Sequence, residues 1–422
     1  MVGLVNCSRW CLPMLMFVSI GNAWALPSNS DILSDIEDLH LHRTEMRFGE
    51  YIERLQRQDL TTQQDLIQQL TAQFALTAQD ELDECRLLSL EDARFALSLA
   101  KERLALTQSN HFSDLTYNGN FSAMQDGQAW YAHWLKSWLQ SSVSTAELEK
   151  IALAELEEVA KKREELKRSN KPGNNASIKA ADKPVIINAF KQRENTVYAY
   201  TESLLGSPYR ASAINIVESN LPKSFPAPGI YNTAEQEFIY HLHTDNLPVK
   251  HMDWLFLHEA VPGHHYFSQY ALHEATCPAL NHLRVSTLFT EGWAAYVETL
   301  GEQLGLYNDT SSLSYALDWQ AMRAVRVLLD VGIHTKGWDD KKAQAVWMAH
   351  IPEQQPIMQR EIDRIRRWPV QVITYVYGKA IIEETISAMR AKHPNLSIAE
   401  IHRLILDRAP FSLNALSSLR GH

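Results

Sequence analysis

The sequence predicts a mostly α-helical protein with at most a small β-sheet, and two observations carry this prediction. In residues 31–168 apolar side chains recur at spacings of three and four with few helix breakers, most clearly in residues 82–106. From Asp253 to the end the pattern is again mostly helical, and between these parts only residues 231–243 resemble strands. The chain has 422 residues, of which 45% are hydrophobic, so it can bury a sizeable core.

Helix starts and helix breaks divide the chain. Residues 144–147 (STAE) form a capping box that opens a helix over residues 145–168, and residues 397–400 (SIAE) cap the last long helix. Residues 169–184 are rich in Asn, Gly, Pro and Ser, which predicts a linker after a helical N-terminal region of residues 26–170. Three later prolines forbid a helix and favour an extended chain: Pro222, Pro226 and Pro228.

The N-terminus has the pattern of a cleavable signal peptide over residues 1–25. Arg9 supplies a positive charge, residues 12–20 form a short apolar core, and Ala-Trp-Ala at residues 23–25 matches a cleavage site. The apolar run is about half as long as a membrane-spanning helix. Cys7 and Cys11 precede this run, whereas a lipoprotein signal needs a cysteine after it. The sequence therefore predicts a periplasmic or secreted protein that is not a lipoprotein and has no membrane span.

Charge and cysteine content restrict the partners and the chemistry. Loss of residues 1–25 removes one positive charge, Arg9, and changes the net charge from −10 to −11. A negative balance argues against nucleic acid or an anionic membrane as partner. Only Cys85 and Cys277 remain, which argues against a cysteine-rich zinc finger and a cysteine nucleophile. An oxidising compartment permits these two residues to pair, and the sequence leaves open whether they do.

Residues 257–267 (LHEAVPGHHYF) resemble the zinc motif H-E-x-x-H with a longer spacing between the histidines. In a regular helix His265 would lie about 10.5 Å along the axis from His258, too far for both to bind one ion. Pro262-Gly263 permits a helix break that brings His264 or His265 back towards His258. Clustering of histidines for hydrogen bonding in the core is the alternative interpretation.

A hydrolytic zinc site needs three protein ligands, an open position for water and a carboxylate that takes the proton of that water. Glu291 is the best candidate for the third ligand, because it lies in an apolar run where an unpaired carboxylate is costly. Glu298 follows two turns later and is either a residue that supports a ligand or a surface acid.

A further helical segment carries Arg326, Asp330 and His334 at intervals of four, near one helix face. One interpretation is an intrahelical salt bridge with a capping histidine. Beside a metal site, Asp330 would instead orient a ligand histidine, and His334 would stabilise charge on the substrate oxygen.

Four segments together resemble the bacterial proteins catalogued as domain of unknown function 885, which look like helical zincins. They are HEAVPGHH, FTEGWAAYVE, RVLLDVGIHTKGW and QVITYVYG, and the resemblance covers about residues 226–413. The chain departs from the family at residues 369–371, where members commonly have Pro-Gly-Gln. The resemblance implies a zincin-like catalytic region over residues 185–422.

The same resemblance implies roles for single residues. It makes His258, His264 and Glu291 the ligands of one Zn²⁺ per chain and Glu259 the general base, and its Gly-His pair favours His264 over His265. Tyr375 is similar to the tyrosine that steadies the oxyanion in helical metallopeptidases; ordinary packing is the alternative.

These residues lead to three functional hypotheses. The first is a secreted zinc metallopeptidase that acts on a peptide or small amide, with the extended segment near Tyr231 pairing with the substrate backbone. The second is a zinc amidase or esterase for non-peptide substrates. The third is a non-catalytic periplasmic binding protein with a structural metal, which a closed shell of four ligands would indicate: His258, His264, His265 and Glu291.

Overall fold

The computed structural model describes residues 47–58, 60–76, 82–275, 286–408 and 413–420. It confirms the mostly helical fold and contains two small sheets within these residues. The predicted signal peptide and Cys277 lie outside the described residues. No helix in the described part of the chain combines the length and the apolar character that a bilayer crossing needs.

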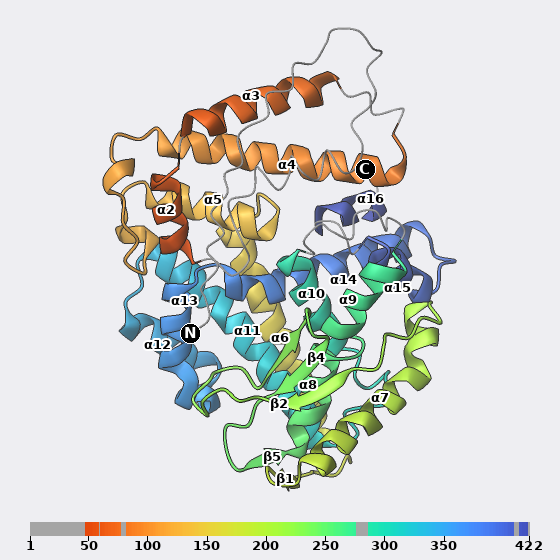
Figure 1. Ribbon diagram of the computed structural model, residues 1–422. Coiled ribbons are helices and arrows are strands. Elements are labelled where there is room, and N and C mark those ends of the chain that lie inside the picture. Colours follow the sequence, from red (N-terminus) through yellow and green to blue (C-terminus); the bar gives the residue numbers. More distant parts are fainter. Residues whose placement is uncertain (1–46, 59, 77–81, 276–285, 409–412, 421–422) are drawn as a thin grey trace, which may run out of the picture.

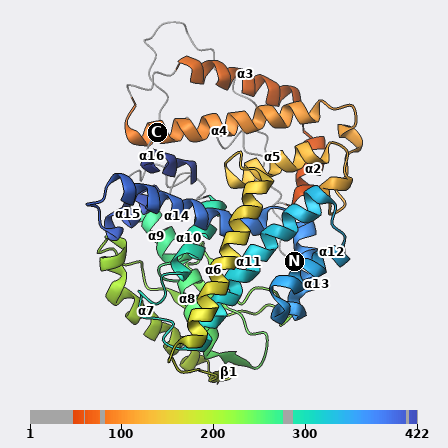
Figure 2. The same cartoon turned by 180° about the vertical axis from the view of Figure 1, so that it is seen from behind.

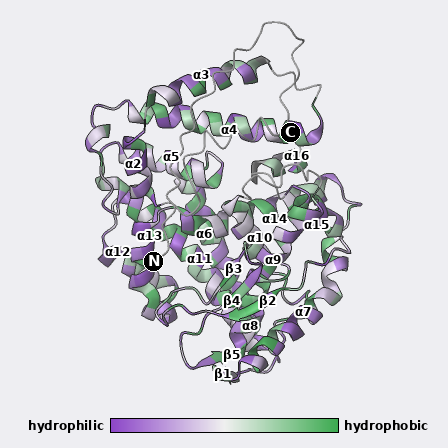
Figure 3. Cartoon of the chain, in the orientation of Figure 1, coloured by the Kyte–Doolittle hydropathy of each residue, from purple (hydrophilic) through white to green (hydrophobic). Residues whose placement is uncertain are grey.

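Helices α2 (Phe48–Gln56), α3 (Leu60–Leu76), α4 (Glu84–Thr107) and α5 (Gly127–Leu139) lie within the N-terminal region that the sequence predicts to be helical. Figure 1 shows α3 and α4 side by side at one end of the molecule. They share a small core that includes Ile67, Leu70 and Leu90. Figure 3 shows polar and apolar residues mixed along both helices.

Helix α6 (Thr145–Arg168) packs in the main core of the protein. The Ser144 hydroxyl caps it by accepting a hydrogen bond from the Glu147 N–H at 3.1 Å, as the sequence predicts. The helix then runs beside α11 (Thr310–Lys336), which Figure 2 shows from behind. Helices α2 and α5 contribute to the same main core, with Phe48 and Trp134 among their buried residues, so much of the predicted N-terminal region of residues 26–170 packs in that core.

The predicted linker contains a strand that sequence patterning does not reveal. Strand β1 (Ser177–Lys179) pairs antiparallel with β5 (Asn246–Pro248). A three-residue strand has no detectable periodicity, and its partner lies far away in the sequence. The second sheet has the order β2-β4-β3 and contains β2 (Asn215–Glu218), β3 (Gly229–Asn232) and β4 (Glu237–Tyr240). Within the described residues strand β3 pairs only with β4, so it is an edge strand of this sheet.

Helix α7 (Lys183–Leu205) packs on this sheet through Phe190, whose ring lies 4.9 Å from that of Phe238. The helices of the site are α8 (Met252–Glu259), α9 (His264–His273) and α10 (Thr287–Glu298). Helices α12 (Asp340–His350), α13 (Met358–Arg367), α14 (Thr374–Lys392), α15 (Ile398–Leu406) and α16 (Ser417–Arg420) complete the body.

Two glycines allow α10 and α14 to approach closely. A Cβ on Gly292 would lie 2.6 Å from the Gly378 Cα, and one on Gly378 would lie 2.5 Å from the Leu288 carbonyl oxygen. Both contacts are shorter than any ordinary van der Waals contact. The crossing therefore requires glycine at both positions, and it fixes the position of α10, the helix that carries Glu291.

A buried histidine of α15 predicts a pH dependence of stability. The Nδ1–H of His402 donates to the Leu204 carbonyl, and Nε2 accepts from the Tyr296 hydroxyl, both at 2.7 Å. Burial lowers the pKa of His402 to about 4. Below pH 6.5 the unfolded chain therefore binds more protons than the folded one, so stability falls from pH 6.5 to 4, by up to about 1.4 kcal/mol per pH unit from this residue.

His402→Gln, which keeps a donor and an acceptor, should flatten this decline in urea unfolding curves measured between pH 7 and 4.5. His393→Gln is the matched control, because His393 is exposed. An unchanged slope for His402→Gln would show that this histidine does not contribute to the pH dependence.

Candidate metal centre

A break between α8 and α9 brings two histidines together. Helix α8 ends at Glu259 and α9 begins at His264. A Cβ on Gly263 would lie 2.0 Å from the His258 carbonyl oxygen, so only glycine fits where the chain turns back over the end of α8. The ring centroids of His258 and His264 lie 4.6 Å apart as a result. The break predicted at Pro262-Gly263 is present.

The two histidines and Glu291 surround one point. Glu291 Oε2 lies 3.6 Å from His258 Nε2 and 3.5 Å from His264 Nε2. These distances exceed those of a hydrogen bond. They match the separation of about 3.3–3.6 Å between ligand atoms that tetrahedral zinc with bonds of about 2.0–2.2 Å requires. Glu291 Oε2 is buried and has no hydrogen-bond partner. The donor set therefore fits one divalent cation.

The structure distinguishes between the two adjacent histidines. His265 lies on the other side of α9, with Nδ1 3.0 Å from the Tyr231 hydroxyl and Nε2 2.7 Å from the Ser212 carbonyl oxygen. Successive helical residues point about 100° apart, so only one of the two histidines can face Glu291. That residue is His264.

Behind His258 a buried carboxylate and a buried guanidinium hold the imidazole. The Nδ1–H of His258 donates to Glu298 at 2.6 Å, and Arg323 donates to both oxygens of Glu298 at 2.8 and 2.7 Å. Burial lowers the pKa of His258, but Glu291 and Glu298 outweigh it and raise the pKa to about 9. Glu298 thus supports a candidate ligand, which was one of its two predicted roles, and leaves Nε2 free to face Glu291.

Glu259 and Tyr375 face the same space as the histidines. They line a cavity of about 260 Å³, here called the front cavity, together with His258, His264 and Glu291. The Tyr375 ring lies 6.3 Å from that of His258. Burial raises the pKa of Tyr375, with a further contribution from Glu291. The proline-rich segment and strand β3 form another wall of this cavity.

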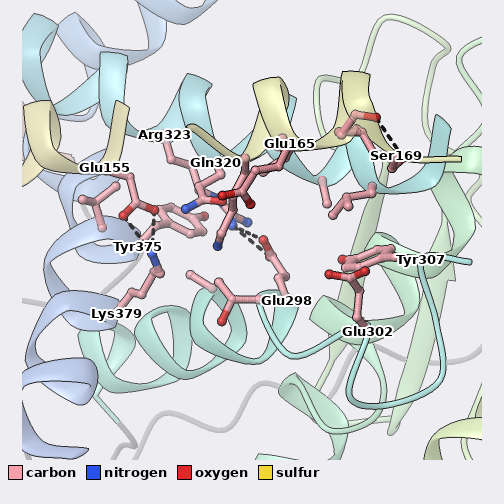
Figure 4. A pocket seen from close by; sticks show the side chains of 18 of the residues that line it. Glu155, Glu165, Ser169, Glu298, Glu302, Tyr307, Gln320, Arg323, Tyr375 and Lys379 are labelled. Atoms are coloured by element: carbon pink, nitrogen blue, oxygen red, sulfur yellow. Dashed lines mark hydrogen bonds and ion pairs between the residues drawn. The ribbon is translucent and has the colours of Figure 1, made fainter. Parts of the chain in front are cut away.

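A second cavity of about 250 Å³, here called the rear cavity, is lined by both members of the Arg323–Glu298 pair (Figure 4). Arg323 and Tyr375 line both cavities. On the rear side Lys379 lies 2.7 Å from both oxygens of Glu155, so this buried cation is fully paired. The sequence analysis does not predict a role for Arg323. A charged residue one turn before Arg326 in an otherwise apolar helix is nevertheless a pattern that could have indicated a buried ion pair.

His334 does not lie in either cavity, which corrects the expectation that it stabilises the substrate oxygen. It is fully buried, packs against the Phe121 and Tyr131 rings, and has Nε2 3.3 Å from the Ile365 carbonyl oxygen. Eight helical residues rotate the side chain by about 80° and move it about 12 Å along the axis relative to Arg326, so the shared face is only approximate.

Asp330 does not contact a ligand histidine either. Its oxygens accept hydrogen bonds from the Tyr131 hydroxyl and the Val370 N–H, both at 2.8 Å. The predicted intrahelical salt bridge is also wrong, because Arg326 pairs with Glu361 of α13 at 2.5 Å.

Comparisons with known proteins agree with this fold. The chain is similar in structure to a chain described as "the putative lipoprotein from Colwellia psychrerythraea", with a TM-score of 0.63 and 20% identity, over 94% of this chain and 70% of that one. It is also similar to "a putative lipoprotein of unknown function from Shewanella oneidensis", with a TM-score of 0.56 and 14% identity, over 92% and 77% of the two chains. No curated protein shows significant sequence similarity to it.

The family described as "Bacterial protein of unknown function (DUF885)" matches residues 32–419. This range includes every residue of the candidate metal centre. The chain therefore belongs to the DUF885 family of bacterial proteins.

Proposed function

We propose that this protein is a zinc-dependent hydrolase that cleaves peptide bonds. One observation carries the proposal: Glu291 Oε2 lies 3.6 Å from His258 Nε2 and 3.5 Å from His264 Nε2, and these residues share a cavity with Glu259. Two imidazoles and one carboxylate are a donor set of catalytic zinc sites.

The residues around the cation have complementary roles in this proposal. His258, His264 and Glu291 would hold the zinc ion, which would supply Lewis-acid chemistry for activating water and polarising a carbonyl group. Glu259 takes a proton from the attacking water and passes it to the leaving amine. Tyr375 donates its hydroxyl proton towards the oxygen that becomes negative. Glu298 keeps the His258 ring in one orientation by accepting its Nδ1–H.

A peptide substrate is favoured by the edge strand β3. Gly229, Ile230 and Tyr231 of this strand line the front cavity, and in the described part of the chain β3 pairs with β4 alone. An extended peptide can add to such an edge through backbone hydrogen bonds. The non-catalytic alternative needs His265 as a fourth ligand, but both of its ring nitrogens have other partners.

The proposal includes export to the periplasm or medium. The two similar structures belong to chains described as lipoproteins, which supports export. For this chain the proposal is a cleaved signal peptide without a lipid anchor, because Cys7 and Cys11 precede the apolar core.

Metal analysis combined with substrate profiling tests the function. The purified protein is expected to contain about one zinc per chain, and to cleave members of a peptide library until a chelator removes the zinc. Cleavage of non-peptide amides or esters alone would favour the amidase or esterase hypothesis. Absence of both metal and turnover would contradict the proposal.

A further inference from the structure

Three arginines surround one buried glutamate beside the front cavity. Glu361 lies 2.5 Å from Arg326 Nη2, 3.3 Å from Arg360 Nη2 and 3.9 Å from Arg364 Nη1. These cations hold the pKa of Glu361 below its ordinary value, although burial raises it. One carboxylate thus serves three guanidinium groups, and the cluster has a surplus of positive charge.

Two of these arginines face the cavity with donors to spare. Arg326 and Arg364 line the front cavity, whereas Arg360 does not. Arg326 is 3% exposed, and its Nε is buried without a hydrogen-bond partner. The short hydrogen bond of Arg364, at 2.7 Å, goes to the neutral amide oxygen of Gln371. Its distance of 3.9 Å to Glu361 is too long for a hydrogen bond.

This cationic wall lies next to the candidate metal centre. The Gln371 side chain joins Arg364 to Tyr375, because its Nε2 donates to the Tyr375 hydroxyl at 3.3 Å. The Tyr375 ring in turn lies 6.3 Å from the His258 ring. Gln371 and Tyr375 therefore connect Arg364 to the side of the cavity that holds His258.

The formal charges of the residues that line the front cavity, together with Glu298 behind Arg323, leave room for one anion. A divalent cation offsets Glu259 and Glu291, and Glu298 offsets Arg323. Glu361 then faces both Arg326 and Arg364, so one positive charge is unbalanced within the cavity. A guanidinium group pairs best with a carboxylate, through two parallel hydrogen bonds.

We propose that Arg364 and Arg326 form a subsite for a substrate carboxylate, and that the enzyme removes residues from the free C-terminus of peptides. The inference rests on the proposed hydrolase function and adds its substrate class. The α-carboxylate binds beside Tyr375 on the leaving-group side of the scissile bond. A carboxylate side chain near the C-terminus has the same chemistry, so the experiment must distinguish the two sources.

Binding to the Glu259→Gln variant tests the subsite without turnover. The probes are a library of N-acetylated tripeptides, each as free acid and as C-terminal amide, measured by titration calorimetry. We expect the free acids to bind about 10- to 100-fold more tightly than the amides. Amides that end in Asp or Glu test whether a side-chain carboxylate can occupy the subsite. If these amides bind as tightly as the free acids, the subsite does not select the C-terminal carboxylate, and the assignment to the C-terminus is overturned.

Arg364→Gln should remove most of the preference for free acids and leave the affinity for amides unchanged. Arg360→Gln is the matched control, because it removes the same charge from the same helix and also contacts Glu361, but lies off the cavity. Equal effects of the two variants would mean that the arginines act only through the stability of the cluster, and would overturn the subsite.

Failure of this inference is distinguishable from failure of the proposed function. Equal cleavage of free acids and amides by the metal-loaded wild-type protein would overturn the carboxylate subsite and leave the hydrolase intact. A protein without metal or turnover would contradict the hydrolase, whatever its preference in binding. Failure of both probe forms to bind would also overturn the subsite.

Discussion

Glu259→Gln is expected to retain about one zinc per chain and to lower kcat by about 10²- to 10⁴-fold, the contribution typical of a general base. Glu259 is 6% exposed and lies in the front cavity beside both candidate histidine ligands. Glutamine preserves the shape and the hydrogen-bonding capacity of the side chain, but it cannot take up a proton from water. Steady-state kinetics on a cleaved peptide and metal analysis of the same sample measure the two effects.

The chain contains a matched control for this variant. His273-Glu274 repeats the His-Glu pair of the site, but Glu274 is exposed at the end of α9. Glu274→Gln should therefore leave both metal content and kcat unchanged. Loss of zinc from Glu259→Gln would identify Glu259 as a ligand, since its carboxylate lies within 4.8 Å of the donor atoms of His258 and His264. Undiminished turnover would exclude it as the base.

Gly263→Ala is expected to lower metal affinity at least about tenfold and the free energy of unfolding by about 2–4 kcal/mol. The added Cβ would lie 2.0 Å from the His258 carbonyl oxygen and 2.3 Å from that of Leu257. Backbone atoms cannot rotate away as a flexible side chain can, so the turn must open. Opening moves His264 away from His258, and the two imidazoles no longer face a common point.

Gly173→Ala is the corresponding control, because a Cβ there would meet its nearest neighbours at an ordinary 3.7 Å. It should keep the wild-type melting temperature and zinc content. The two glycine variants are compared by thermal unfolding and by competition with a chromogenic chelator. Wild-type metal affinity in Gly263→Ala would show that the tight turn does not position the histidines.

Much of the fold follows from local pattern. The capping sequences at Ser144 and Ser397 and the helical periodicity around them predict α6 and α15, because caps and amphipathic faces depend on neighbouring residues. Strand β1 could not be predicted in this way. It exists through pairing with β5, whose residues Asn246–Pro248 lie across the sheet but far away in the chain.

In the candidate site, too, some features follow from local sequence and others depend on tertiary packing. The helix break, the histidine pair and the isolated acid Glu291 are visible as residue types in unusual surroundings. The positions of His265 and His334 are not, since a small change of helix rotation decides whether a side chain faces the cavity or the core. Glu298 was ambiguous, and Arg323, Arg326 and Arg364 acquire their roles only through partners on other helices.

The sequence by itself determined the helical class, the break after α8 and the kinds of donor atoms, because backbone preferences and residue chemistry act locally. Only the tertiary structure decided that His264 rather than His265 faces Glu291, and that Glu298 and Arg323 support His258. These choices depend on how α8, α9, α10 and α11 pack. Packing joins residues that are distant in the sequence, and no local pattern encodes the direction in which their side chains meet.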